Sequence, residues 1–226
     1  ERGFSIFFFV FGRRILRRMS YLWGRFPIAC GRVAACTSED ALQMKVGLFI
    51  PCYINAVYPR VGQATCELLT RLGCEVDYPL EQTCCGQPLA NAGFERDARA
   101  LAERMDALFA GYDYVVGPSS SCVVFVREGY PRLLPDYRPH ACVDARIWEV
   151  CEFIHDILRP THLDACFPHR VSLHHSCHGV RHMGLSSPSE QHVPSYSKLR
   201  DLLAMVDGVE VVEPERRDEC CGFGGM

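Results

Sequence analysis

Cysteine is the residue type that dominates the possible chemistry of this sequence, with 14 copies in 226 residues. Seven of them form two sets, each built around the tripeptide Cys-Cys-Gly: Cys52, Cys84, Cys85 and Cys122, followed by Cys177, Cys220 and Cys221. Thiolates are the soft ligands that iron–sulfur clusters require, and a four-iron cluster normally takes four of them. The glycine after each pair, Gly86 or Gly222, allows the sharp bend that turns both sulfurs to one centre. The pattern predicts iron–sulfur binding.

The elements between these cysteines place the first set at one edge of a sheet. From Met44 onward the sequence predicts strands at Lys45–Ile50, Cys74–Tyr78 and Tyr114–Val116, and helices at Val61–Leu72 and Phe94–Ala110. Strands that alternate with helices imply right-handed crossovers and a mainly parallel sheet, in which ligands gather at the carboxyl ends of the strands. Each cysteine of the first set falls at such an end or in the loop that follows it.

A similar order of elements follows in the second half of the chain. We expect a connecting helix at Trp148–Leu158 and a polar linker at Pro160–His169. A strand at Val171–His175 then leads to the first cysteine of the second set. A helix over 199–206 and a strand at Val209–Val212 lead to its Cys-Cys-Gly.

The repeated order predicts an α/β fold of two similar Rossmann-like units with mainly parallel sheets. The first unit is expected at 44–145 and the second at 171–226, with the connecting helix and linker at 146–170 between them. Internal duplication is the economical explanation of the repeat. The second unit is expected to be incomplete, because its cysteine set has three members rather than four.

Residues 1–43 differ from the rest in charge. They hold seven Arg and three acidic residues, which makes this segment +4 and leaves −7 for the remainder of a chain whose net charge is −3. The apolar run Phe4–Phe11 precedes the Arg cluster, the reverse of the order in a secretory signal, and is shorter than the roughly 20 residues that span a bilayer. A basic amphipathic segment can lie on a membrane surface, so any membrane association is expected to be peripheral. We favour an extension outside the fold, with Met44 as the native start.

Other uses of so many cysteines fit the sequence less well. A disulfide scaffold would require export, and because no secretory signal is evident we expect a cytoplasmic protein. Four thiolates would also suit a closed structural zinc site, but zinc ribbons usually carry paired Cys-x2-4-Cys knuckles, which are absent from this spacing. A zinc-binding interaction module without enzymatic activity is kept as an alternative. The net charge gives no reason to expect nucleic-acid binding.

Further histidines and cysteines lie near or between the two sets. Histidines at 174, 175 and 178 flank Cys177, and we favour hydrogen bonds to backbone or ligand sulfur over direct ligation or proton relay. Five cysteines are expected to act as small apolar residues: Cys66, Cys74, Cys142, Cys151 and Cys166.

The strings around the cysteines carry a family resemblance. They are Cys84-Cys85-Gly86-Gln87-Pro88, Pro118-Ser119-Ser120-Ser121-Cys122 and Cys220-Cys221-Gly222-Phe223-Gly224-Gly225. This pattern resembles the cysteine-rich domain found in heterodisulfide reductases, glycolate oxidase iron–sulfur subunits and lactate-utilisation iron–sulfur proteins, and is most similar to the last. A complete set in these proteins is a cysteine, a long gap, Cys-Cys-Gly, a similar gap and Cys-x-x-Cys.

The resemblance covers Met44–Met226 and differs from the full pattern in two places. Ser119 stands where the leading cysteine of the first Cys-x-x-Cys is expected, which leaves four thiolates in place of the five that hold a noncubane cluster in the heterodisulfide reductase relative. The second Cys-x-x-Cys is absent before Met226, so we expect a C-terminally truncated sequence.

The resemblance implies a 4Fe-4S cofactor and a redox subunit of an L-lactate-oxidising complex rather than a complete enzyme. Its partners would be the other subunits of that complex, including a second iron–sulfur protein. It assigns no catalytic residue. An iron–sulfur subunit of a glycolate oxidase or of a heterodisulfide reductase-type oxidoreductase is the alternative within the same superfamily.

Overall fold

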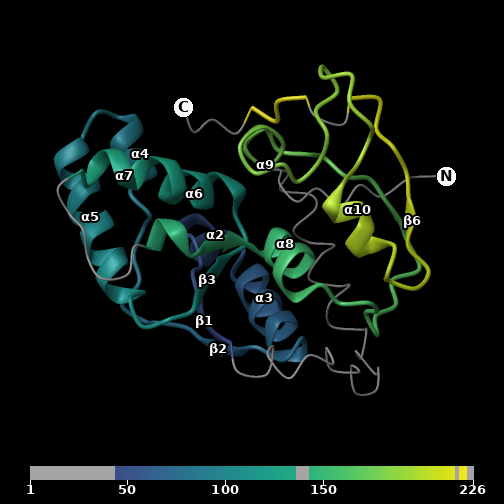
Figure 1. Ribbon diagram of the computed structural model, residues 1–226, viewed down its shortest axis with the longest axis horizontal. Helices are drawn as coiled ribbons and strands as arrows, with labels where there is room; N and C mark the ends of the chain where they lie inside the picture. The colour runs from purple at the N-terminus through teal and green to yellow at the C-terminus, as the bar shows by residue number, and fades with distance from the viewer. Residues whose placement is uncertain (1–43, 136–142, 217–218, 223–226) are drawn as a thin grey trace.

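The computed structural model describes residues 44–135, 143–216 and 219–222, which include two parallel sheets (Figure 1). The larger sheet has four strands in the order β2-β1-β3-β4, and the smaller pairs β5 with β6. The strands are β1 (Lys45–Leu48), β2 (Glu75–Asp77), β3 (Tyr114–Gly117), β4 (Ile147–Glu149), β5 (Arg170–Val171) and β6 (Glu210–Val211). The expected α/β class with parallel pairing is therefore confirmed.

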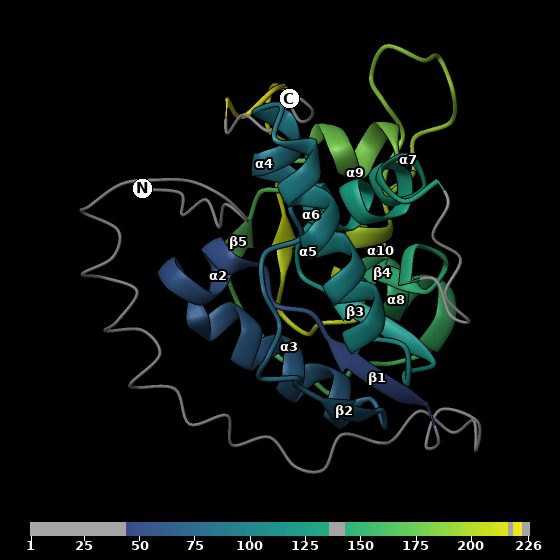
Figure 2. The same ribbon diagram turned by 90° about the vertical axis from the view of Figure 1, so that its left-hand side faces the viewer.

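Helices cover both faces of the four-stranded sheet. The α-helices are α2 (Cys52–Val57), α3 (Pro59–Arg71), α4 (Gln87–Asn91), α5 (Glu95–Leu108), α6 (Ser120–Val124), α7 (Tyr130–Leu133), α8 (Val150–Phe153), α9 (Cys177–Arg181) and α10 (Lys198–Leu203). The segments η2 (Phe125–Gly129) and η4 (Ile154–Leu158) are π-helical, and η3 (Val143–Ala145) is a 3-10 turn. Helix α5 lies in front of the sheet in Figure 2, with α6 and α7 in the same layer, and α3 and α8 cover the opposite face (Figures 1 and 2).

The central strands are buried on both faces, as parallel strands under two helical layers must be. In β1, Val46 is 0% exposed and Leu48 is 2% exposed. In β3, Val115 packs among α5 and α6 side chains while Val116 packs among those of α3 and α8. The alternation of side chains along a strand sends these neighbours to opposite layers.

Three of the predicted strands and both long helices of the first half are confirmed, but the start of the next predicted helix is wrong. Trp148 lies in β4, which pairs in parallel with β3 through Gly117 and Glu149, and the helix begins only at Val150. Glu149 accepts hydrogen bonds from the amides of Cys151 and Glu152 and so caps this helix. The sheet therefore has a fourth strand, β4, that the sequence pattern did not predict.

Elements in the second half are shorter than expected but follow the predicted order. The strand expected over 171–175 is reduced to β5, and the strand expected over 209–212 is reduced to β6. Arg170 pairs with Glu210 in the same parallel sense in which Lys45 pairs with Glu75. Residues 1–43 lie outside the described part of the chain, and so does Cys142.

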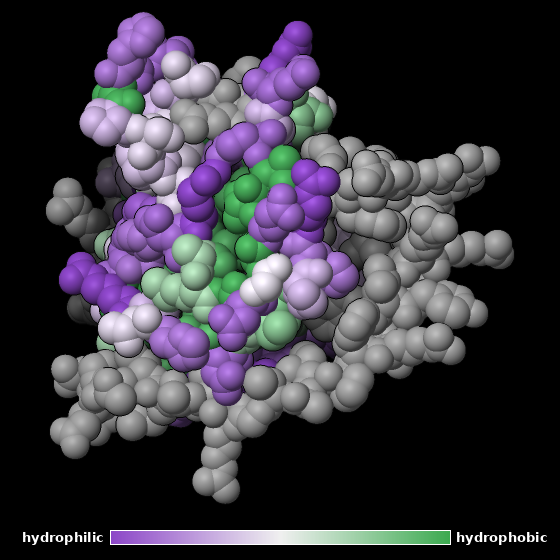
Figure 3. Space-filling model, turned by 90° about the vertical axis from the view of Figure 1, so that its right-hand side faces the viewer, coloured by the Kyte–Doolittle hydropathy of each residue, from purple (hydrophilic) through white to green (hydrophobic). Residues whose placement is uncertain are grey.

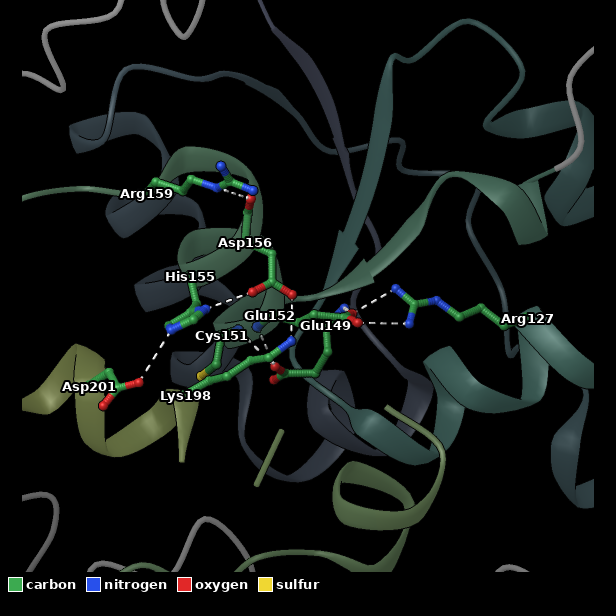
Figure 4. Close-up of polar contacts among 9 residues, drawn as sticks. All are labelled: Arg127, Glu149, Cys151, Glu152, His155, Asp156, Arg159, Lys198 and Asp201. Atoms are coloured by element: carbon green, nitrogen blue, oxygen red, sulfur yellow. Dashed lines mark hydrogen bonds and ion pairs between the residues drawn. The ribbon is translucent and has the colours of Figure 1, made fainter. Parts of the chain in front are cut away.

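Polar contacts join α10 to the helical layer formed by α8 and η4 (Figure 4). The Lys198 ammonium lies 2.5 Å from an Asp156 carboxylate oxygen, and His155 Nε2 lies 3.4 Å from an Asp201 oxygen. His155 also contacts Asp156 through its other ring nitrogen at 2.6 Å. The two halves are therefore tied together by an ion-pair network as well as by packing.

A second junction lies between α6 and α9, which pack against each other. A methyl group on Gly179 of α9 would lie 3.0 Å from Ser176 Oγ and 3.1 Å from Leu185, and 3.6 Å from Ser120 Oγ of α6, so the close contacts of this glycine are within its own half of the chain. Beside this contact, His182 Nδ1 lies 3.0 Å from a Glu128 oxygen of η2.

The face that carries β6 is mixed in character. In Figure 3 a group of apolar side chains lies in its middle, with hydrophilic side chains around it. The valines of this part of the chain, Val209, Val211 and Val212, are half-buried.

None of the helices in the described ranges is both long enough and apolar enough to cross a membrane.

Candidate metal centre

The first cysteine set lies at the carboxyl edge of the four-stranded sheet. After β1 the chain passes Pro51 and places Cys52 in the first turn of α2. The loop after β2 carries Cys84 and Cys85, and Cys122 lies in the first half of α6, just after β3. The sequence predicted Cys122 in a loop, whereas Ser120–Val124 forms a short helix.

The four thiols are in contact with one another. Hydrogen bonds join Cys52 to Cys84, Cys84 to Cys85, and Cys85 to Cys122. Cys52 is exposed and Cys84 is half-buried, whereas Cys85 is 2% and Cys122 is 6% exposed. Cysteines from three separate segments of the chain therefore form one group with a solvent-facing end and a buried end.

The pKa shifts alternate in direction along the group. A hydrogen bond with Cys85 is the main cause that lowers the pKa of Cys84 to about 5, and a hydrogen bond with Cys85 is also the main cause that lowers the pKa of Cys122. Because the Cys85 thiol has one hydrogen, it donates to only one of these two sulfurs at a time. Burial raises the pKa of Cys52 to about 11, and the bonds to Cys122 and Cys84 raise the pKa of Cys85. The pKa values of Cys84 and Cys122 are thus shifted toward the thiolate, the form in which cysteine binds metals.

Both Cys-Cys-Gly tripeptides have the same local geometry. Gly86 has φ = 92° and Gly222 has φ = 72°, values in the left-handed region that favours glycine. In each tripeptide the glycine amide donates to the sulfur of the first cysteine at 3.4 Å, Cys84 in one case and Cys220 in the other. The bend predicted after each cysteine pair is therefore present, and it directs an amide hydrogen at a sulfur.

Two residues that sequence reasoning missed hold the first Cys-Cys-Gly loop in place. Gln82 accepts from the amide of Ile50 at 2.7 Å and donates to the carbonyl of Leu48 at 3.1 Å, which fastens the loop to the end of β1. The hydroxyl of Tyr130 donates to the carbonyl of Cys85 at 2.9 Å. Neither residue has a spacing or neighbour in the sequence that would have identified it.

Hydroxyl groups surround the buried end of the first set. Ser119 is 2% exposed, and its hydroxyl accepts a hydrogen bond from Tyr53 at 3.1 Å. Both Ser119 and Ser121 hydrogen-bond to Cys122, and these bonds help to lower its pKa. Burial raises the pKa of Tyr53, so its hydroxyl keeps its proton. The sequence drew attention to Ser119 but gave no sign of Tyr53.

The second set is not gathered in the same way. Cys177 occupies the first turn of α9, and its sulfur lies 3.8 Å from His178 Nδ1. Cys220 and Cys221 are both exposed, and His174 contacts the carbonyl of Glu219 at 2.6 Å beside them. Within the described residues, no hydrogen bond joins the sulfur of Cys177 to either of the other two.

The remaining described cysteines lie away from these groups. Cys74 is buried in the apolar layer under β2, and Cys66 packs at the margin of that layer. Burial raises the pKa of Cys151, and Cys166 is exposed. Cys74 fits the expectation of a small apolar residue in the core, and Cys66 and Cys151 are half-buried beside it, whereas Cys166 is exposed and does not fit.

The donor set suits an iron–sulfur cluster in ligand type and number. Four cysteine side chains meet at one place, the pKa values of two of them are lowered, and amide and hydroxyl groups hydrogen-bond to the sulfurs. In the parts of the chain that the structure describes, no three Cys, His, Asp or Glu side chains are grouped so that they could hold a metal ion. The thiol contacts run in series, and a four-iron cluster takes its thiolates at separate corners instead of around a single ion.

Sequence comparison identifies the family. Residues 46–127 and 171–226 match the Cysteine-rich domain family, CCG. Lactate utilization protein A of Geobacillus thermodenitrificans is 43% identical over 186 residues, which are 80% of this chain and 73% of that protein. The proteins of the same name from an Exiguobacterium species and Oceanobacillus iheyensis are 41% and 40% identical, again over 80% of this chain and over 71% and 72% of their own lengths. The chain belongs to the CCG cysteine-rich domain family, together with these lactate utilization proteins.

Proposed function

We propose that this protein is an iron–sulfur electron-transfer subunit of an L-lactate-oxidising complex, with a four-iron cluster held by Cys52, Cys84, Cys85 and Cys122. The observation that carries the proposal is the contact of these four thiols at the carboxyl edge of the sheet. The relatives named lactate utilization protein A support the choice of substrate system.

Each part of the site has a role in holding and using such a group. A bound four-iron cluster supplies one-electron redox chemistry. Cys85 and Cys122 form the buried side and keep water away, while Cys52 faces solvent and marks the side on which a redox partner can approach. The amide of Gly86 and the hydroxyls near Cys122 stabilise negative charge on the sulfurs.

Internal duplication accounts for the second set. Six positions separate Val46 from Cys52, and six separate Val171 from Cys177, and the family match begins at the first residue of each pair. We infer that the second unit is an incomplete copy of the first and that Cys177, Cys220 and Cys221 are the corresponding ligands. Together these parallels support two Rossmann-like units of common origin.

Lactate oxidation itself is assigned to partner subunits. This chain contributes electron transfer, and the other subunits of the complex, including a second iron–sulfur protein, contribute substrate oxidation and onward transfer. Lactate, together with the partner subunits, is expected to reduce the cluster, glycolate is not expected to reduce it, and a heterodisulfide is not expected to reoxidise it.

Metal analysis of the anaerobically purified protein tests the cluster. The wild type is expected to contain iron and acid-labile sulfide in equal amounts, about four of each for an intact first site. Cys85→Ala should lose this iron and sulfide, whereas Cys66→Ala, a change in α3 away from the site, should keep both. Zinc without sulfide in the wild type, or unchanged iron and sulfide in Cys85→Ala, would contradict the proposal.

A further inference from the structure

Three serines occupy the position just before a helix, where a serine hydroxyl usually accepts a hydrogen bond from a backbone amide of the first turn. Ser176 does so before α9, accepting from the amide of Gly179 at 3.1 Å, and Ser197 does so before α10, accepting from Arg200 at 3.2 Å. Ser119 has the same position before α6 but makes no such bond. Helix capping therefore does not explain the orientation of the Ser119 hydroxyl.

The Ser119 hydroxyl is instead directed into the cysteine site. It accepts a hydrogen bond from Tyr53 at 3.1 Å and lies 3.4 Å from Ser121 Oγ. It also hydrogen-bonds to the sulfur of Cys122, and only 2% of Ser119 is exposed. The buried Ser119 hydroxyl therefore contacts the Cys122 sulfur and does not cap α6.

Counting donors fixes the direction of this chain. The Tyr53 hydroxyl has one hydrogen, which it donates to Ser119. Because Ser119 accepts that bond, its own single hydrogen can be donated either to Ser121, 3.4 Å away, or to the sulfur of Cys122. A ligand sulfur carries negative charge, and hydrogen bonds to a charged acceptor are the stronger ones, so Cys122 is the favoured acceptor. A Cys122 thiolate has no hydrogen and can only accept. The chain therefore runs from Tyr53 through Ser119 to the sulfur of Cys122.

We propose that Tyr53 and Ser119 are positioning residues whose hydroxyl chain donates to the Cys122 sulfur and raises the reduction potential of the cluster bound there. The inference rests on the proposed function, because it needs a cluster held by Cys122. Ser119 stands where the complete family pattern has a further cysteine, so the site receives a hydrogen bond at the place of a fifth thiolate.

The expected change in reduction potential follows from the negative charge on the cluster and its thiolate ligands. Reduction adds an electron to the cluster and increases the negative charge on its thiolate ligands. A hydrogen bond to a ligand sulfur becomes stronger as that charge increases, so it stabilises the reduced form and makes reduction easier. The bond lies in a buried region, where electrostatic interactions are stronger than in water. Loss of the Ser119 hydroxyl should shift the potential to a more negative value.

A potentiometric titration of the anaerobically purified full chain, followed by electron paramagnetic resonance, tests the chain of donors. Ser119→Ala is expected to shift the midpoint potential to a more negative value at unchanged iron content, and Ser119→Thr, which keeps a hydroxyl, is expected to restore it. Tyr53→Phe should give a smaller negative shift. The double variant should shift no further than Ser119→Ala, because Tyr53 acts through Ser119.

Ser197→Ala is the matched control. It removes a serine that does cap its helix, so it should lower the urea midpoint of unfolding and leave the potential unchanged. Ser119→Ala also removes the acceptor of the Tyr53 hydroxyl, so it should lower the urea midpoint and shift the potential together. An unchanged potential in Ser197→Ala then shows that lower stability alone does not shift the potential.

The failure of this inference is distinguishable from failure of the proposed function. An unchanged potential in Ser119→Ala with full iron content would overturn the hydrogen-bond role and leave the cluster assignment intact. Loss of iron from Ser119→Ala would also overturn it, because the oxygen would then be a ligand. A wild type without iron and sulfide would overturn the proposed function, and this inference with it.

Discussion

Tyr130 supports the first Cys-Cys-Gly loop through the backbone of Cys85, whose carbonyl oxygen accepts the tyrosine hydroxyl at 2.9 Å. Both residues are 2% exposed. Tyr130→Phe keeps the ring but leaves a buried carbonyl without this donor, which should lower the free energy of unfolding by about 1–2 kcal/mol. Urea denaturation followed by circular dichroism measures the loss.

Tyr196→Phe is the control for this change, because the Tyr196 side chain is 47% exposed. Its effect should stay within about 0.5 kcal/mol, as for most surface substitutions. Equal effects of the two variants would show that the bond to Cys85 contributes nothing specific.

Glycine at position 86 is required both by backbone conformation and by space. Gly86 and Gly93 have similar positive φ values, 92° and 84°, but a methyl group on Gly86 would lie 3.3 Å from the carbonyl oxygen of Ala98, whereas Gly93 has no atom within 4 Å of that position. Gly93→Ala should cost about 1 kcal/mol for the left-handed conformation alone. Gly86→Ala should cost more, because the backbone of α5 must also move.

Thermal unfolding of the two glycine variants separates these contributions. The difference between them reports the contact with Ala98, since the conformational penalty is common to both. A Gly86→Ala protein as stable as Gly93→Ala would mean that the loop can shift without cost.

Arg127 and Glu152 form a two-bond ion pair between η2 and α8, with nitrogen–oxygen distances of 3.0 and 2.6 Å (Figure 4). The Glu152 side chain is 7% exposed, so removal of its partner leaves a buried carboxylate unpaired. Arg127→Met should therefore lower the free energy of unfolding by about 3 kcal/mol. Arg71→Met breaks the exposed pair with Glu67 and should cost less than about 1 kcal/mol. Similar losses in the two variants would contradict this interpretation.

Glu149 should make stability depend on pH. Burial raises its pKa from 4.5 to about 7, so the folded state holds a proton that the unfolded state has released between these pH values. The unfolded chain then binds fewer protons than the folded chain, and stability falls as pH rises through this window. The total change is up to about 3 kcal/mol.

Glu149→Gln isolates this contribution, because glutamine keeps an oxygen that can accept from the amides of Cys151 and Glu152 but does not titrate. The free energy of unfolding of both proteins is measured by urea denaturation from pH 4 to pH 8. The wild type should lose stability relative to the variant as pH rises from about 4.5 to about 7. Parallel curves would contradict a raised pKa.

The secondary structure was predictable where the local sequence pattern of a segment is enough to determine it. The helix of 59–71 has apolar residues at three- and four-residue intervals, and β1 and β3 are compact apolar runs, so local pattern was sufficient. Strand β4 was missed because Trp148, Cys151 and Ile154 also fit a helical period. Its three residues become a strand only through pairing with β3, a contact about thirty positions away in sequence.

The sequence grouped the four cysteines of the first set correctly but did not reveal the residues that hold them. Cysteine is rare enough that type and spacing predicted which four would lie together, and their role as ligands stays a prediction. Tyr53, Gln82 and Tyr130 are ordinary residue types whose roles depend on contacts between distant elements. The short helix α6 was likewise hidden, since five residues are too few to form a helix without tertiary packing.

The contact between α6 and α9 sets the separation of the two cysteine sets. These helices carry Cys122 and Cys177, one from each set, and they pack directly against each other. If both sets hold clusters, as we propose, the distance that an electron must cross between them depends on this helix contact. A substitution that separates α6 from α9 would then slow electron transfer without altering any cysteine.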